Sequence, residues 1–167
     1  MEEYMTLSHQ WELLLFFCTT ALRKILIKNN IIKRCIPFVN QCFISKCTSE
    51  TVNHLLIHCT VAIELWALVF TKFGIWWVMS KRVIKVLFGW CSWFSKHRSS
   101  SARNGATLCL MWTILRERNN QMFNDKETTI LELKSSFLRE FFERSQVIGP
   151  SGLNSMINFV DSLSFRL

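Results

Sequence analysis

The chain has 167 residues, of which 50% are hydrophobic, which suits one domain with a substantial apolar core. Its 20 Lys and Arg residues outnumber its 12 Asp and Glu residues, and the net charge of +8 favours contact with nucleic acid or another acidic surface. The aspartates are Asp125 and Asp161 alone, so the carboxylate cluster of a two-metal polymerase or nuclease is missing from the sequence. The sequence also lacks a P-loop and the glycine-rich motif of dinucleotide-binding proteins. We therefore predict a single non-enzymatic domain, residues 1–167, with no small-molecule substrate.

The N-terminal segment Trp11–Asn30 has apolar residues at helical spacing, so we expect a helix there. Glu2, Glu3 and Glu12 precede its short apolar run, which therefore lacks the positively charged leader of a signal peptide. The sequence has no Asn-x-Ser/Thr sequon, and its 7 Cys residues do not make complete disulfide pairs. These features predict a reduced intracellular protein, in the nucleus or cytoplasm, that is not secreted.

The next segment carries four candidate zinc ligands with the spacing C-x4-C-x6-H-x4-C: Cys42, Cys47, His54 and Cys59. Zinc in proteins is typically held by four Cys and His side chains in a tetrahedron. Compact zinc sites commonly use C-x2-C, but the residue three after Cys42 is Ser45, and a neutral hydroxyl is a poor zinc ligand. Either Cys47 replaces it, or the site has three good ligands. The alternative is a metal-free loop, because cysteines are often simply small buried hydrophobic residues.

The clearest amphipathic helix is predicted for Val61–Phe73, with Gly74 as its stop signal. Thr51 or Asn53 is expected to cap a short helix that begins near His54. Because the long helix directly follows the candidate zinc ligands, a bound metal would anchor its first turn and direct its apolar face towards the core. That face comprises Ala62, Leu65, Trp66, Val69, Phe70 and Phe73.

The stretch Val61–Met79 is long enough to cross a membrane. However, Glu64 and Lys72 interrupt it, and Gly74 lies near its centre. Charged side chains inside a membrane span are costly, so we expect no membrane insertion.

The stretch Ile75–Phe94 is dense in aromatic residues and predicts a helix capped by Ser80. Its tryptophans could stack on nucleic acid bases, although such residues more often belong to the core. In a metal-free protein the same stretch would be a partner-binding surface. The tryptophans concerned are Trp76, Trp77, Trp90 and Trp93.

The segment Ser95–Asn104 is the most polar and least periodic one, so we expect a loop there. Its basic residues, together with those around Ser80, could form a rim that contacts the phosphates of RNA or DNA. The alternative is a solvated surface loop. The candidate nucleic-acid-binding residues are Lys81, Arg82, Lys85, Lys96, Arg98 and Arg103.

Three further helices are predicted: Ala106–Phe123, Glu127–Gln146 and a short one within Ser151–Leu163. The first of them is expected to bury Leu108, Met111, Trp112 and Leu115, with Leu110 and Ile114 widening this stripe, and the second to bury Ile130, Leu133, Phe137 and Phe141. The predicted fold class is therefore mainly α, a helical domain with a small irregular zinc-binding loop over residues 42–59.

The motifs NQCFISK, TVNHLLIHC and TVAIELW, followed later by LMWTILRERNNQMF, resemble the zinc-binding domain downstream of the reverse transcriptase in plant LINE-type (non-LTR) retrotransposons. The segment LRKILIKNNIIKRC also resembles the lead-in of that domain, so the resemblance covers roughly residues 16–142. Three ligand positions and a motif tryptophan of the family fall on Cys42, His54, Cys59 and Trp66. A second motif falls on Trp112, Glu117, Arg118, Asn119 and Phe123. Ser45 stands where the family has its second cysteine.

The resemblance implies a non-catalytic, zinc-binding, nucleic-acid-associated accessory module. In a reverse transcriptase polyprotein such a module would help to hold template RNA or target DNA for the polymerase. Because the polymerase motifs are missing here, it further implies a stand-alone or degenerate fragment. The alternative interpretation is a metal-free helical protein-interaction domain with no retained retrotransposon activity.

Overall fold

The computed structural model describes residues 41–76, 78–94 and 100–148, and within them the side chains of residues 41–76, 78–90 and 105–145. These residues contain no strand, and none of their helices is both long enough and apolar enough to cross a membrane. The mainly helical fold class is therefore confirmed. The helices are η1 (His54–His58, a π-helix), α3 (Thr60–Phe73), α4 (Val83–Phe94), α5 (Ser100–Asn124) and α6 (Ile130–Ile148).

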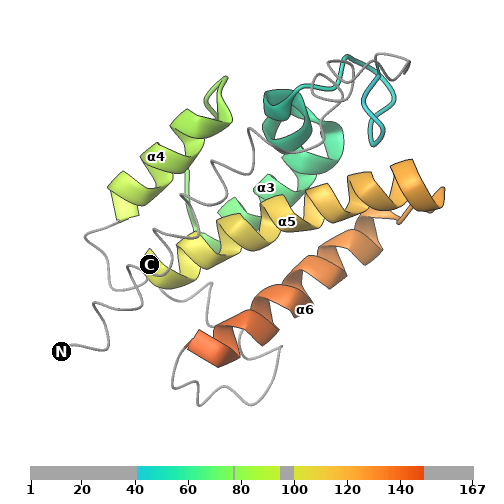
Figure 1. Cartoon of the computed structure of the whole chain (residues 1–167). Helices are drawn as coiled ribbons and strands as arrows, with labels where there is room; N and C mark the ends of the chain where they lie inside the picture. The colour runs from blue at the N-terminus through green and yellow to red at the C-terminus, as the bar shows by residue number, and fades with distance from the viewer. Residues whose placement is uncertain (1–40, 77, 95–99, 149–167) are drawn as a thin grey trace.

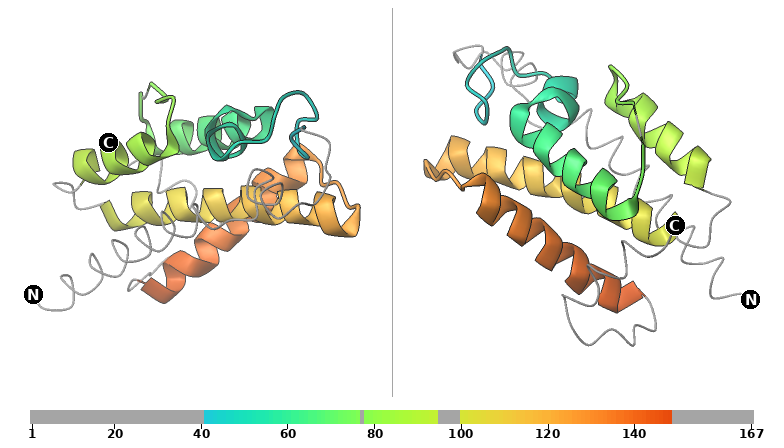
Figure 2. Two further views of the ribbon diagram at one scale, coloured as in Figure 1. Left: turned by 45° about the horizontal axis from the view of Figure 1, so that its top comes forward. Right: turned by 180° about the vertical axis from the view of Figure 1, so that it is seen from behind.

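Helix α5 lies at the centre of the described structure (Figure 1). Helix α6 runs antiparallel to it on one side, after the short connection 125–129, and α3 lies on the other side (Figure 2). Helix α4 and η1 also contact α5, and α3 contacts both η1 and α6. The long central helix is thus the support on which the predicted metal loop is placed.

The core forms where the apolar faces of these helices meet. Trp66 and Trp90 lie edge to face with ring centroids 5.8 Å apart, and Phe137 stacks on Phe141 at 6.1 Å. Complete burial of one large apolar side chain stabilises the fold by about 1.5–3 kcal/mol. The buried apolar residues of α3, α5 and α6 are Ala62, Leu65, Trp66, Val69, Phe73, Ala106, Leu108, Cys109, Leu110, Met111, Ile114, Leu133, Phe137 and Phe141.

The helix ends follow local sequence signals. Helix α3 ends at Gly74, as predicted, with φ 61° and with its N–H donating to carbonyl groups of the last turn. Helix α6 begins at Ile130 rather than at the predicted Glu127, because Thr129 and Glu132 form a capping box. The Thr129 hydroxyl accepts from the N–H of Glu132 at 3.3 Å, and the Glu132 carboxylate accepts from the N–H of Thr129 at 3.1 Å.

Two further details of the sequence-based prediction were wrong. Residues 100–104, predicted as part of a loop, form the first turn of α5, because a polar turn can extend a helix whose later turns are buried. Trp112, predicted to be buried, is 52% exposed, because the buried face of α5 is centred on Leu110 and Ile114, which were predicted only to widen it. The helices predicted for Trp11–Asn30 and Ser151–Leu163 lie outside the described residues.

Candidate metal centre

The predicted ligands Cys42, His54 and Cys59 converge in the structure. Their donor atoms, two sulfurs and one imidazole nitrogen, all lie within 4.8 Å of one another. Cys42 is 1% exposed, Cys59 is 0% exposed, and His54 is half-buried. Donors on one tetrahedral zinc ion, with bonds of about 2.0–2.3 Å, lie roughly 3.5–3.8 Å apart, so small shifts would close this cluster around an ion. Thiolate and imidazole are also the donors that zinc prefers, and the residues present therefore fit a zinc ion.

The π-helix η1 explains how two ligands of the spacing H-x4-C reach one point. Side chains five residues apart on an α-helix point about 140° away from each other. In η1 the N–H of Cys59 instead donates to the carbonyl oxygen of His54 at 2.6 Å, five residues back. The wider π-turn returns the chain to nearly the same side after five residues. Because this segment is a π-helix, His54 and Cys59 lie close together although five positions separate them in the sequence.

Three side chains hold η1 in place. The Thr51 hydroxyl accepts from the N–H of His54 at 3.1 Å, which confirms it as the cap of the short helix. Asn53, the other candidate, caps a different element, because its Oδ1 accepts from the first N–H of α4 at 3.0 Å. The indole N–H of Trp66 donates to the carbonyl oxygen of Leu56 at 2.9 Å inside the core. The motif tryptophan therefore fixes the backbone that carries two of the donors.

The first donor lies in a tight turn, closed by the N–H of Lys46 donating to the carbonyl oxygen of Cys42 at 2.8 Å. Lys46 has φ 55°, in the left-handed region, which costs a residue with a Cβ about 1–2 kcal/mol. The turn places Ser45 beside the donors, with its Oγ 3.2 Å from Nε2 of His54. Cys47 is exposed, and its thiol donates to the carbonyl oxygen of Ser45 at 2.9 Å. The predicted fourth ligand Cys47 thus lies outside the group of converging donors.

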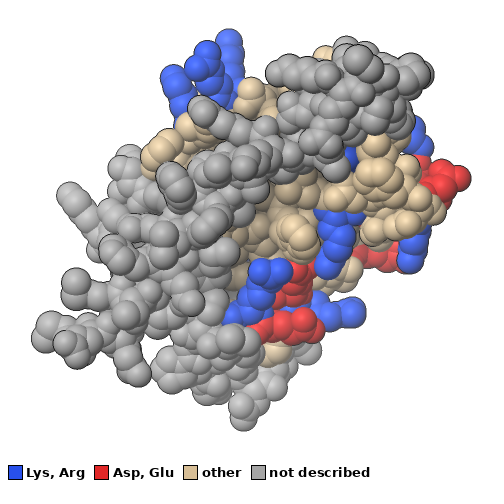
Figure 3. Space-filling model, viewed as in Figure 1, with Lys and Arg blue, Asp and Glu red and all other residues tan. Residues whose placement is uncertain are grey.

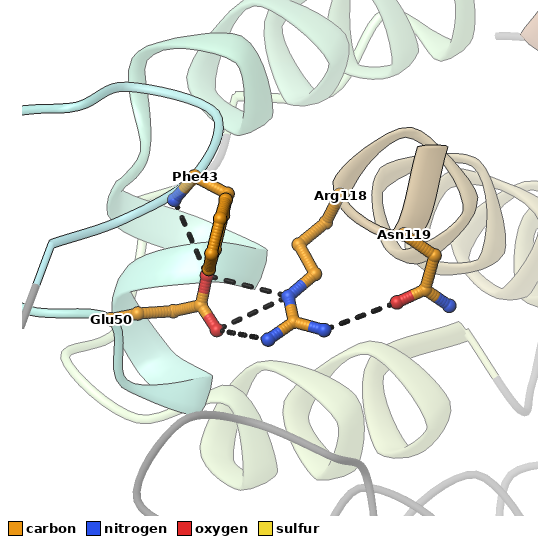
Figure 4. Close-up of polar contacts among 4 residues, drawn as sticks. All are labelled: Phe43, Glu50, Arg118 and Asn119. Atoms are coloured by element: carbon orange, nitrogen blue, oxygen red, sulfur yellow. Dashed lines mark hydrogen bonds and ion pairs between the residues drawn. The ribbon is translucent and has the colours of Figure 1, made fainter. Parts of the chain in front are cut away.

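A buried ion pair joins this turn to α5 (Figure 4). Arg118 Nη2 lies 2.8 Å from Glu50 Oε1, and the two side chains are 1% and 0% exposed. The same carboxylate accepts from the N–H of Phe43 at 3.4 Å, while the guanidinium lies 5.5 Å from the centroid of the Phe43 ring. Arg118 also donates to Oδ1 of Asn119 at 3.2 Å. Because Phe43 directly follows Cys42, the ion pair fixes the backbone next to the first donor.

The two converging cysteines are joined by a hydrogen bond, so that one proton lies between their sulfur atoms. The hydrogen bond from the Cys59 thiol lowers the pKa of Cys42 well below its usual range, and the Ser45 hydroxyl acts in the same direction against the effect of burial. The same bond, together with burial, raises the pKa of Cys59. Near neutral pH one sulfur is therefore a thiolate and the other a thiol. A metal ion binding here would take the place of the shared proton.

Residues 7–66 match the family model described as zinc-binding in reverse transcriptase. This range contains Cys42, His54 and Cys59 and ends at Trp66, so the match and the geometry support a zinc-binding domain in the same region. It spans about a third of the chain and includes residues 7–40, which lie outside the described part. No curated protein and no solved structure matches the chain. The plant LINE-type origin stays a prediction.

The predicted nucleic-acid-binding residues lie around the start of α4 where the structure describes them. Lys81, Arg82 and Lys85 are all exposed. Figure 3 shows Lys and Arg side chains projecting from the molecule at the upper end of α4 as drawn in Figure 1. The carbonyl oxygen of Lys81 lies 3.3 Å from Nε2 of His58, which connects this basic segment to η1. The other three predicted nucleic-acid-binding residues are Lys96, Arg98 and Arg103, and their side chains lie outside the described part of the chain.

Sequence reasoning missed Glu50 and the role of Arg118. A signal was present, because Glu50 is the acidic residue of a loop whose other charged side chain is Lys46. Arg118 stood in the second motif without an assigned contact. The structure gives both residues one role, which is to connect the loop to the central helix.

Proposed function

We propose that the chain is a non-catalytic zinc-binding module that associates with nucleic acid inside the cell, like the accessory domain of a retrotransposon reverse transcriptase. The observation that carries this proposal is the convergence of Cys42, His54 and Cys59 within the region that matches the zinc-binding family model. A zinc ion there would join the turn at Lys46 to η1 and to the start of α3. Its binding free energy would help to order the exposed residues 46–49 of the turn, which bury little surface of their own.

The proposed contact with nucleic acid is supported by the distribution of charge. Every charged residue between Glu64 and Glu117 is a Lys or an Arg. Those around the start of α4 are exposed beside the metal loop. Such a basic surface attracts the phosphate backbone and releases its counterions, which gives binding that weakens steeply with salt.

Metal analysis of the full chain, made with and without added zinc, tests the first part of the proposal. We expect one zinc ion per chain, and we expect Cys59→Ser to lower zinc content and helicity together, because metal binding and folding of the loop are coupled. Cys109→Ala is the matched control, since this buried cysteine lies in α5 outside the donor group. Wild-type protein without zinc above background, or a Cys59→Ser variant with unchanged zinc content and folding, would remove the metal from the proposal.

Binding of a single-stranded RNA oligonucleotide and a DNA duplex at several salt concentrations tests the second part. Lys85→Glu is expected to weaken binding of either and to reduce the salt dependence by about one unit in the slope of log K against log salt. Lys126→Glu makes the same charge change at the end of the α5–α6 hairpin and should leave binding almost unchanged. Equal losses in the two variants, or no binding at low salt, would overturn the proposed nucleic-acid contact.

A second candidate function, a metal-free protein-interaction domain, is favoured by exposed apolar side chains before and on α4. Trp76 is 101% exposed, Val78 is 92% exposed, and Phe88 is 69% exposed, whereas Trp90 of the same stretch is buried in the core. Exposed apolar groups of this kind mark contact surfaces. If zinc-free protein keeps its helicity and forms oligomers that Trp76→Ser abolishes, this candidate replaces the first.

A further inference from the structure

The Ser45 hydroxyl occupies the place beside the donor cluster where a fourth ligand would be expected. Its Oγ lies 3.2 Å from Nε2 of His54, and it also hydrogen-bonds the sulfur of Cys42. The left-handed turn at Lys46 produces this placement, because it reverses the chain directly after Ser45. The side chain that faces the cluster from the turn is thus a neutral hydroxyl, which binds zinc poorly.

The nearest other sulfur does not fill that place. Cys47 follows the left-handed residue and is exposed, and its thiol is directed to the carbonyl oxygen of Ser45. Its Sγ is not among the donor atoms that lie within 4.8 Å of one another. The turn therefore favours three protein donors over four.

The fourth coordination position of a metal ion bound by these three donors would face solvent. Cys42 and Cys59 are buried against the core, whereas His54 and Ser45 are half-buried and Thr48, whose Oγ1 lies 3.1 Å from Nδ1 of His54, is exposed. A zinc ion with three protein ligands keeps its remaining position for water or another small ligand, whereas a fully structural site is closed by four.

We propose that the metal centre has three protein ligands and an exchangeable fourth position beside Ser45, held by water and open to a small external thiolate. This inference rests on the proposed function, because it requires that Cys42, His54 and Cys59 bind a metal. Thiolate is the donor chemistry that completes such a site, since it matches the two sulfurs already present. The Ser45 hydroxyl would be placed to hydrogen-bond the external ligand.

Cobalt(II), which reports its ligands by its absorption spectrum, tests this in the full-length chain. The protein is loaded with cobalt in buffer kept reduced by a phosphine and then titrated with 2-mercaptoethanol. We expect the thiolate-to-cobalt absorption of the wild type to increase and to saturate at one thiol per metal. Ser45→Cys should show the larger absorption from the start and should not respond to the thiol. Ser45→Ala should still respond, but at higher thiol concentration than the wild type, because it lacks the hydroxyl that hydrogen-bonds the external ligand.

The variant Cys47→Ser separates the competing arrangements. It should behave as the wild type does if the fourth position is open. Loss of thiolate absorption in Cys47→Ser before thiol is added would show that Cys47 is the fourth ligand and would overturn the proposal, as would a wild-type spectrum that ignores the thiol. If neither the wild type nor Ser45→Cys binds cobalt or zinc, the proposed metal function itself is wrong, and this inference fails with it.

Discussion

The metal loop, residues 41–59, and the helical bundle of α3, α5 and α6 are held together by different kinds of contact. The bundle is stabilised by buried apolar side chains, such as Phe137 of α6, whose ring stacks on Phe141 within the core. The second half of the loop also reaches the core, through Leu55, Leu56 and Ile57 of η1. Its first half, residues 41–50, depends chiefly on a few directional contacts, such as the Glu50–Arg118 ion pair and the turn at Lys46. A directional contact is lost entirely when one partner changes, whereas apolar packing is lost in proportion to the atoms removed. The candidate metal function therefore lies in the part of the molecule that single substitutions disturb most selectively.

The largest loss of stability is expected from a core substitution in the bundle. Phe137→Ala removes a buried aromatic ring and should lower the free energy of unfolding by about 3–5 kcal/mol. Because Phe137 lies in α6 and is not one of the donors, the zinc affinity of the protein that remains folded should be unchanged. Urea unfolding with and without zinc measures both quantities. A fall in the zinc affinity of the folded fraction would show that the loop and the bundle are not separately stabilised.

A comparable loss of stability is expected when the ion pair between the loop and the bundle is removed. Arg118→Met leaves the carboxylate of Glu50 buried without its partner, which should cost about 3–5 kcal/mol in the free energy of unfolding. Unlike Phe137→Ala, it should also weaken zinc binding, because the backbone beside Cys42 loses its support.

The double variant Glu50→Met/Arg118→Met is the control for the charge. Replacing both partners removes the uncompensated carboxylate, so more than half of the stability lost in Arg118→Met should return. A loss below about 1 kcal/mol in Arg118→Met, or no recovery in the double variant, would mean that this ion pair does not hold the loop.

The pH dependence of zinc binding reports on the cysteine pair within the loop. The pKa of Cys42 is lowered, so it is already a thiolate at pH 7.5, whereas the pKa of Cys59 is raised, so it still holds its proton. Zinc must displace that proton, and its affinity should therefore increase with pH by about tenfold per unit, or about 1.4 kcal/mol, between about pH 7.5 and 8.5.

Calorimetry in buffers with different ionisation enthalpies measures the proton released on zinc binding. Cys59→Ser, which lacks one of the donors and is expected to lose zinc, supplies the background heat that does not come from metal binding. A zinc affinity independent of pH in the wild type would contradict the shared proton.

The smallest change in stability is expected from substitutions of Lys46 in the left-handed turn. Lys46→Gly should raise the free energy of unfolding by about 1 kcal/mol, because glycine adopts the left-handed conformation without the steric cost of a Cβ. Lys46→Ala is the control, since it removes the exposed ion pair with Glu127 but keeps that cost, so it should be no more stable than the wild type. Thermal unfolding of the three proteins compares them. Equal stability of the glycine and alanine variants would show that the turn carries no backbone strain.

The helices were predictable because their signals are local. The apolar spacing of α3, its stop at Gly74 and the inward positions Leu133, Phe137 and Phe141 of α6 could all be read directly along the chain. Trp112 was misplaced because an apolar residue between two candidate stripes can face either way until neighbouring helices choose the buried face. The first turn of α5 was missed because polar residues become helical there by extending a helix that is stabilised elsewhere.

The sequence by itself identified Cys42, Cys47, His54 and Cys59 as candidate donors and predicted a mainly helical domain around them, because both signals are local: the chemistry of the residues and the spacing of the apolar ones. The tertiary structure decided which side chain stands in the fourth place. It sets Ser45 beside the cluster and turns Cys47 outwards through the left-handed turn at Lys46. It also decided that Glu50 meets Arg118, because a contact between residues far apart in the chain depends on how the helices pack.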